Sequence, residues 1–417
     1  MILSGIASRH DLPLPFWTVL LGAAVVLLIT FWVIGFAWRS PRHTKPTVKE
    51  LPRLSAVVDS RGVRIALWMV AAPIWLLAAA ALIFGPDRID NPAVGFIYVW
   101  LWVGLVVFSV LFGRFYTRIN PARLLMRAGR GRSAGSLIPS ALALLAFLYL
   151  ELVHPAGATL PVLRIAAGAL LVWLIAGVVL RGKGWIGRAD PFDVYATTVA
   201  RMSIWTRSER GVLAYTSPLA NLASWRAPTG LAAVCVVLLG GTLFDALSNT
   251  AWWVRMLQRQ EGWSHALGVV GLLGSIAFVG VLFLIGCWPL KGREGLRATA
   301  DSLAPGLIPL VVGYALSHYG TMLYLEGQRT ALRFSDPLGQ GWNLFGGAEL
   351  APDVSLFAFP TAIALLQVAL IVGGHVLGVL VTHDLSLQWG AAVRPQLPLL
   401  VVMIGFTVGG LLLMFGA

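Results

Sequence analysis

The sequence predicts an all-α, polytopic bundle of transmembrane helices, and its composition, the length of its apolar runs and the placement of its basic residues lead to this prediction. Of the 417 residues, 58% are hydrophobic and 12% are charged, whereas a soluble domain carries roughly a quarter charged residues. The apolar residues form continuous runs of about twenty, enough for a helix to cross a hydrocarbon core of about 30 Å. A β-barrel would instead show alternating segments of roughly ten residues.

Ten such runs divide the chain, and residues 1–417 are expected to form a single integral membrane domain. The expected spans are residues 16–38, 65–85, 94–112, 137–153, 160–180, 229–248, 266–290, 303–327, 357–383 and 396–415. The run at 137–153 is the shortest of them. No internal repeat is obvious, so the sequence does not support an inverted-repeat transporter architecture.

The basic residues predict the orientation of these spans. Of the 31 Lys and Arg residues, 24 lie in the alternate loops 39–64, 113–136, 181–228, 291–302 and 384–395. One more, Arg164, lies inside a span, and the six on the opposite side are Arg9, Arg88, Arg255, Arg259, Arg329 and Arg333. Because basic residues accumulate in cytoplasmic loops, we predict that both termini are outside. The net charge of +13 therefore reflects orientation in a lipid bilayer, and no nucleic-acid partner is expected.

Two loops have distinctive compositions. Residues 189–207 include Asp190-Pro191 and have an apolar periodicity, which suggests a helix lying along the membrane interface on the cytoplasmic side. The favoured alternative is a connector whose basic residues reach the lipid phosphates. Residues 335–353 are rich in Gly, Pro and Asp. They are expected to form a lid-like outer loop rather than a helix.

Ionisable side chains within the spans are the candidate functional residues, because burying a charge at the centre of a membrane helix costs about 2.5 to 3.5 kcal/mol. At 1.5 Å per residue, Glu151, Asp245 and His318 rise to roughly the same depth, in the outer third of the membrane. Glu326 lies two turns beyond His318, and His154, His10 and Asp11 lie near the same surface. Asp245, His318 and Glu326 are the predicted acid–base residues, and Asp245, His318 and Glu151 are predicted to bind a divalent metal, if one is present.

A second group of candidates lies toward the cytoplasmic side. His375, His383 and Asp384 share the helix GGHVLGVLVTHD and are further candidate metal ligands. The alternative for both groups is a structural hydrogen bond between helices. The sequence contains no G-x-S-x-G elbow, Walker sequence, C-x-x-C-H site or H-E-x-x-H motif. The chemistry of the residues alone therefore does not identify a reaction.

Several stretches of the chain resemble the bacterial membrane proteins called fenitrothion hydrolase or fenitrothion hydrolase-like. They are RHDLPLPFW, NPAVGFIYVWLWVGL, LGGTLFDALSNTAWW, LIPLVVGYALSHYGTMLYLEGQ, SDPLGQGWNLFG and VALIVGGHVLGVLVTHD. The resemblance covers nearly the whole chain. It implies a multi-pass protein of the bacterial cytoplasmic (inner) membrane that hydrolyses apolar organophosphorus triesters. The roles of Asp245, His318 and Glu326 within these stretches remain an inference from their chemistry.

Three functions are consistent with these observations. The first is a membrane-embedded hydrolase whose outer site activates water against an apolar small-molecule triester, with or without a metal. The second is a permease or ion-coupled transporter of a small solute, which buried ionisable groups also suit. The third is a structural subunit that assembles with a second membrane subunit.

Overall fold

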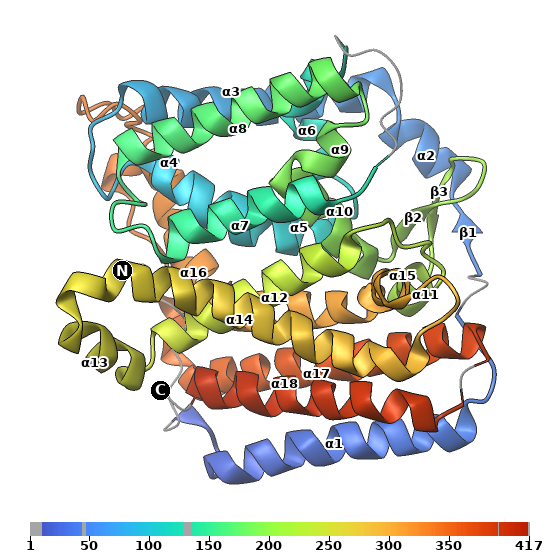
Figure 1. Cartoon of the computed structure of the whole chain (residues 1–417). Helices are drawn as coiled ribbons and strands as arrows, with labels where there is room; N and C mark the ends of the chain where they lie inside the picture. The colour runs from blue at the N-terminus through green and yellow to red at the C-terminus, as the bar shows by residue number, and fades with distance from the viewer. Residues whose placement is uncertain (1–10, 44–46, 128–134, 391, 416–417) are drawn as a thin grey trace.

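The computed structural model describes residues 11–43, 47–127, 135–390 and 392–415. Its long helices lie side by side with nearly parallel axes (Figure 1), and the strands are limited to one small sheet. This arrangement confirms the prediction of an all-α fold.

Nine helical segments of the described chain are long and apolar enough to cross a membrane, which is the character of a multi-pass membrane protein. They are α1 (Phe16–Ala37), α3 (Arg61–Phe84), α4 to α5 (Pro92–Phe112), α8 (Leu160–Arg181), α12 (Leu231–Ser248), α14 with its final turn (Ser264–Leu290), α15 to α16 (Leu296–Arg333), α17 (Pro360–Gln388) and α18 with its first turn (Arg394–Phe415). The remaining predicted span, at 137–153, forms the apolar helix α7 (Ile138–Leu152), which has only 15 residues.

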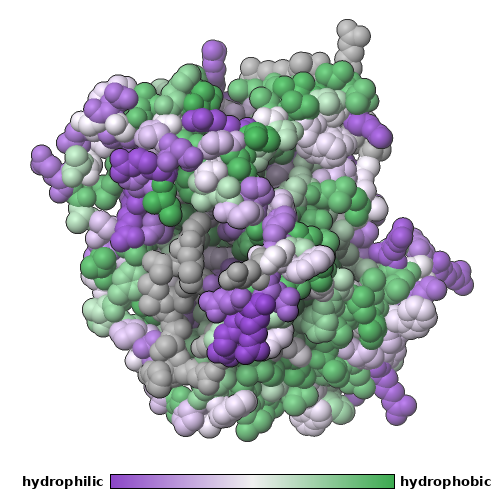
Figure 2. All heavy atoms as spheres, turned by 60° about the vertical axis from the view of Figure 1, so that its left-hand side comes forward, coloured by the Kyte–Doolittle hydropathy of each residue, from purple (hydrophilic) through white to green (hydrophobic). Residues whose placement is uncertain are grey.

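The loops of the bundle sort onto two ends. We call one the sheet end, because it holds the antiparallel sheet of β1 (Lys49–Glu50), β3 (Leu213–Tyr215) and β2 (Trp205–Arg207). The short helices α2 (Pro52–Val58) and α11 (Pro218–Ala223) lie there too. We call the other the terminal end, because α1 begins there and α18 ends there (Figure 1). Figure 2 brings the terminal end forward and shows hydrophilic side chains gathered on it, with hydrophobic side chains over much of the flanks.

Hydrogen bonds join loops that the sequence assigned to the same side. At the sheet end, Asp59 accepts hydrogen bonds from Arg118 and Arg207, which belong to two other basic loops. The hydrogen bond from Arg207, together with that from Arg118, holds the pKa of Asp59 well below its usual range. At the terminal end, Asp87 accepts a hydrogen bond from the backbone of Leu160. Loops that alternate along the sequence therefore lie alternately at the two ends of the bundle.

The loop at 335–353 is ordered by its own polar side chains. Asp336 accepts hydrogen bonds from the backbone of Gln340 and Gly341, and Ser335 accepts hydrogen bonds from the backbone of Phe345 and Gly347. Apart from the short 3-10 turn η8 (Gly347–Glu349), the loop contains no helix, as predicted.

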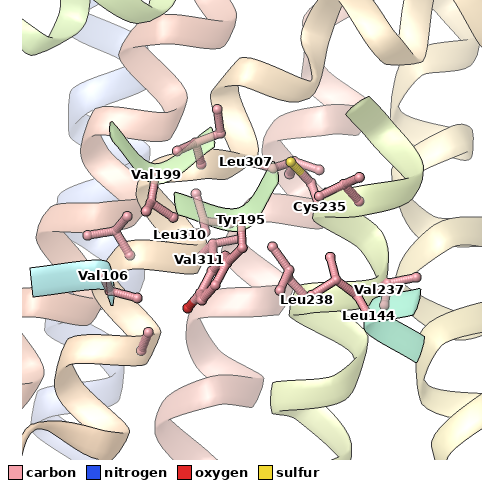
Figure 3. Close-up of a cluster of buried hydrophobic side chains, with 14 of the residues drawn as sticks. Val106, Leu144, Tyr195, Val199, Cys235, Val237, Leu238, Leu307, Leu310 and Val311 are labelled. Carbon is pink, nitrogen blue, oxygen red and sulfur yellow. The ribbon is translucent and has the colours of Figure 1, made fainter. Parts of the chain in front are cut away.

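The segment at 189–207 corrects one prediction. It does not lie along an interface: after α9 (Ile186–Ala189) it forms α10 (Pro191–Val199), which is buried in the bundle against α5 (Leu105–Phe112), α7 and α16 (Ile308–Arg333). Figure 3 shows Tyr195 and Val199 of α10 among Leu238, Leu310 and Val311. Nearly every residue of the helix is buried, whereas an interfacial helix keeps one polar face in water.

Two short segments of the chain form a paired structure that the sequence did not reveal. In the first segment, residues 118–123, Asn120-Pro121 begins the helix η3 (Pro121–Arg127). In the second, residues 188–193, Asp190-Pro191 begins α10. The Asn120 side-chain amide donates to Asp190 at 2.8 Å, and Arg123 donates two hydrogen bonds of 2.7 and 2.8 Å to Asp193. We call these four residues the proline clasp. Burial, together with the nearby charge of Asp193, raises the pKa of Asp190 to about 6.

Candidate functional site

Asp245 and His318, which the sequence placed at one depth on separate spans, are in direct contact. His318 Nε2 lies 2.9 Å from Asp245 Oδ2, and the Tyr319 hydroxyl donates to the same oxygen at 2.6 Å. The Asn249 side-chain amide donates to the other carboxylate oxygen at 3.2 Å. Asp245, His318 and Tyr319 lie in the interior of the bundle, about one turn from the terminal end of α12, and Asn249 is half-buried at that end.

Aromatic rings fix the orientation of the imidazole. The ring of Tyr314 stacks on His318 with a centroid separation of 5.3 Å and an interplanar angle of 27°. The ring of Tyr319 meets His318 edge-on at 4.7 Å. The Tyr314 hydroxyl in turn donates to the backbone carbonyl of Thr242 on α12, at 3.2 Å. The imidazole is therefore held between two phenol rings while its Nε2 faces the carboxylate.

Glycines allow α12 to carry Asp245 into this crowded position. A Cβ atom at Gly240 would lie 2.4 Å from the backbone of Ile276 on α14, and one at Gly241 would lie 2.5 Å from Leu148 on α7. Both distances are shorter than side-chain carbon atoms tolerate. Small residues of this kind let membrane helices approach closely. They bring α7 against α12, and with it Glu151, the third residue predicted at this depth.

Glu151 faces the same site from α7. It lies close enough to Asp245 and Tyr319 for its charge to affect both groups. Its Oε2 atom is buried without a hydrogen-bond partner, and His318 Nδ1 is in the same state. We call Glu151, Asp245, His318 and Tyr319 the core cluster. Buried polar atoms without a partner are uncommon in native structures and call for a physical reason.

A distorted helix borders the core cluster. Residues Phe96–Gly104 form η2, a nine-residue π-helix that packs against α16. Its Tyr98 lies within range of the charge of Glu151, and the Tyr98 hydroxyl donates to the carbonyl of Gly157 at 2.8 Å. π-Helical turns are rare, and they occur frequently at functional sites.

The structure does not bring Glu326 into this site. Its carboxylate pairs with Arg329 at 2.5 Å and lies 4.0 Å from Arg333, on the same helix as His318 but nearer the end of the bundle. Two cations already neutralise this carboxylate.

The second predicted group forms a separate structural unit at the sheet end. Asp384 is fully buried and accepts hydrogen bonds from the Trp38 indole and from the backbone N–H groups of Arg42 and His43. His383 Nδ1 lies 2.7 Å from Gln396 Oε1, and His383 Nε2 lies 3.0 Å from the Trp38 carbonyl oxygen. We call His383 and Asp384 the sheet-end tether, because they join α17 to the segments that follow α1 and precede α18.

His375 lies apart from both groups. Its Nδ1 lies 2.8 Å from the carbonyl oxygen of Ile371 on its own helix, and its Nε2 is buried without a partner.

The described residues do not supply a metal site. No three His, Cys, Asp or Glu side chains within the ranges that the structure describes lie close enough to hold a metal ion together. Asp245 and His318 bond to each other, and the atoms of the sheet-end tether are already partnered. His10 lies outside the described residues. The described donor set therefore does not fit the predicted divalent metal.

Two surface hollows lie at the terminal end, and neither is lined by the core cluster. One, of about 310 Å³, lies between the loop at 86–92 and the end of α16 with the loop that follows it. The other, of about 290 Å³, lies along the short helix α13 (Ala251–Arg259).

Sequence reasoning missed the tyrosines of the site. Tyr319 and Tyr314 lie one residue after and four residues before His318, in the stretch GYALSHYG. Tyr314 lies one helical turn before an intramembrane histidine, and that spacing could have identified it, whereas Tyr319 directly follows the histidine and helical spacing gives no signal for it. Tyr98 carried no comparable signal, because it lies in a different, uniformly apolar span.

No protein-family model matches the chain, and no curated protein or solved structure is significantly similar to it. The function has to be inferred from the site itself.

Proposed function

We propose that this chain is a proton-coupled membrane carrier, and that the core cluster takes up and releases the coupling proton. The observation that carries the proposal is the pair of buried, unpartnered acceptor atoms, His318 Nδ1 and Glu151 Oε2, beside a carboxylate that holds the imidazole by its other nitrogen. Ionisable groups inside a membrane bundle are costly, and they commonly mark proton relays.

The chemistry follows from the hydrogen bonds. An ionised Asp245 only accepts, so His318 Nε2 carries the hydrogen of the 2.9 Å contact, and Nδ1 holds a free lone pair. Nδ1 can therefore accept a proton. The imidazolium that forms is stabilised by the Asp245 carboxylate next to it. Glu151 on α7 provides a second acceptor in the same low-dielectric region, within electrostatic range of Asp245.

The topology we propose places this site on a path across the membrane. The chain crosses the bacterial cytoplasmic membrane ten times, with the terminal end outside and the sheet end in the cytoplasm. Two observations support this orientation: the loops of the sheet end carry most of the basic residues, and they bond to one another. The short helix α7, the fourth along the chain, then completes the ten spans, and its final turn carries Glu151 toward the outer surface.

Hydrolysis of an apolar ester is the second candidate function. It is favoured by the Asp245–His318 pair, in which a carboxylate orients an imidazole whose other nitrogen is free to act as a general base. The resemblance to fenitrothion hydrolase-like proteins supports the same function. A triester requires a cavity beside that nitrogen, whereas a proton does not. A carrier likewise requires a path for its solute, and the two hollows described above are lined by other residues.

One experiment separates the two functions. Proteoliposomes are loaded with a pH-sensitive dye and exposed in turn to labelled amino acids, sugars, carboxylates and a nitrophenyl organophosphorus triester. Solute uptake with lumenal acidification, abolished in Asp245→Asn and His318→Ala but present in Glu326→Gln, would support the carrier. Release of nitrophenolate that depends on the same residues, without uptake of any solute, would replace the carrier with the hydrolase.

A further inference from the structure

The short helix α13 at the terminal end presents two arginines that pair with no side chain of the described residues. Arg255 and Arg259 lie one helical turn apart and are exposed, and neither has a hydrogen-bond, ion-pair or ring partner within the described chain. Side chains four residues apart on a helix lie on the same face. Two guanidinium groups therefore point in a similar direction with their charges uncompensated.

The other described arginines near this end are all partnered. Arg88 pairs with Asp90 at 2.9 Å, and Arg329 pairs with Glu326 at 2.5 Å. Arg333 lies 4.0 Å from the same glutamate, and Arg164 donates to the carbonyl of Leu82. The two arginines of α13 are thus exceptional at an end where the chain carries few basic residues. Two neighbouring cations without a partner among the described side chains suit a negatively charged ligand from outside the protein.

The surroundings of these arginines indicate a ligand with an apolar part. A hollow of about 290 Å³ is lined by Arg255 and Arg259 together with Trp252, Met256 and Gln260. Trp252 is 59% exposed, and Trp263, which follows α13, is 69% exposed. Exposed tryptophans at the end of a membrane bundle are typical of the headgroup level of the bilayer. The hollow therefore combines two cations with an aromatic and an aliphatic wall.

The position of α13 is fixed by one buried residue. Trp253 packs edge-on against Phe244 at 5.5 Å. It fills the space over Gly271 on α14, where a Cβ atom would lie 2.4 Å from Trp253 Cη2. The Thr250 side chain caps the first turn of α13 by accepting a hydrogen bond from the backbone of Trp253. The hollow is therefore a built feature of the fold.

We propose that this hollow binds the phosphate group of an anionic glycerophospholipid, with Arg255 and Arg259 on the phosphate and Trp252 and Met256 along the glycerol and the first acyl carbons. Guanidinium groups match phosphate oxygens in geometry as well as in charge. A partly amphipathic helix with basic and aromatic residues is suited to the interface between headgroups and acyl chains. The site does not depend on the chemistry of the core cluster.

Native mass spectrometry of the full-length protein in detergent tests the proposal. The protein is titrated with phosphatidylglycerol, with diacylglycerol of the same acyl chains, and with inorganic phosphate. A basic residue near a membrane surface contributes about 1 kcal/mol toward an anionic lipid, or about five-fold in affinity. The double variant Arg255→Gln, Arg259→Gln should therefore bind phosphatidylglycerol about 25-fold more weakly than the parent protein. Its thermal unfolding should be unchanged, because neither side chain has a partner in the part of the chain that the structure describes.

A matched control removes two charges from the same end at partnered positions. The double variant Arg88→Gln, Arg329→Gln should bind phosphatidylglycerol nearly as well as the parent protein. The proposal is overturned if the two double variants lose affinity equally, or if diacylglycerol binds as well as phosphatidylglycerol. It is also overturned if inorganic phosphate alone shows the same dependence on Arg255 and Arg259, because the ligand would then be a free anion and not a lipid.

Discussion

The core cluster and the sheet-end tether each contain a buried histidine and a buried aspartate, yet their hydrogen bonding differs. In the tether, three N–H groups donate to Asp384, and both ring nitrogens of His383 face oxygen atoms. In the core cluster, His318 is held by one nitrogen only, and Glu151 keeps one oxygen without a partner. The two sites also lie near opposite ends of the bundle, so neither contacts the other.

This difference distinguishes a structural site from a functional one. A fully partnered polar network in a low-dielectric interior rigidifies the fold. A polar network with unpartnered buried atoms lowers the stability of the fold. Such a network is retained where those atoms take part in binding or proton transfer. On this basis, the tether should resist unfolding and contribute nothing to turnover, whereas the core cluster should behave in the opposite way.

Asp245→Asn should have the largest effect on function. The amide cannot stabilise an imidazolium, so proton transfer at His318 should slow by about 10²- to 10⁴-fold, the range typical of a positioned acid or base. Dye acidification or nitrophenolate release, measured per folded molecule, checks this. Wild-type rates in a folded Asp245→Asn protein would remove the functional role of the core cluster.

Asp384→Ala should have the largest effect on stability. It leaves the buried Trp38 indole and two partly buried backbone N–H groups without their acceptor, at a cost of about 1 to 3 kcal/mol for each donor that cannot find water. Thermal unfolding in detergent should show this loss, while the rate per folded molecule is retained. A marked fall in that rate would show that the tether also takes part in function.

Arg123→Ala should destabilise the proline clasp by a smaller amount. Asp193 is almost fully buried, but Arg123 is about one-quarter exposed, so water can partly replace the lost partner. We expect a loss of about 2 kcal/mol, below the 3 to 5 kcal/mol typical when a fully buried pair is broken. The exchange Arg123→Asp, Asp193→Arg should recover part of this stability. If the exchanged protein is less stable than Arg123→Ala, the two charges do not act as a pair.

Asp190 should give the stability a pH dependence. Its pKa in the folded protein is about 6, above the ordinary value of 3.8, so the folded state binds more protons between these two pH values. Stability should therefore fall as pH rises from about 4 to about 6 and level off above that. Asp190→Asn should flatten this part of the profile. An unchanged slope in the variant would assign the dependence to another group.

Glu326→Gln should have the smallest effect. Its carboxylate is about one-fifth exposed and pairs with arginines on its own helix, a class of interaction that contributes about 0.3 to 0.5 kcal/mol. Function should be retained, in contrast to Asp245→Asn. Loss of transport or hydrolysis in this variant would extend the site toward the end of the bundle.

The sequence by itself determined the helical class, the positions of the helices and the alternation of their loops. These properties depend on the run length of apolar residues and on where basic residues interrupt them, and both are local. The common depth of Glu151, Asp245 and His318 also followed from the sequence, because depth along a helix is a count of residues. Depth alone could not show that Asp245 and His318 touch while Glu326 pairs elsewhere.

The tertiary structure decided the lateral contacts. Glycines at 240 and 241 set how closely α7 and α14 approach α12, and this approach depends on side chains of other helices. The burial of α10 and the pairing of Asn120 with Asp190 likewise join segments about seventy residues apart. The two segments share only a short pattern, an arginine two residues before Asn-Pro or Asp-Pro, which is too brief to identify as a repeat. Which buried polar atoms lack a partner is a property of all the neighbouring helices together, so no single stretch of sequence contains it.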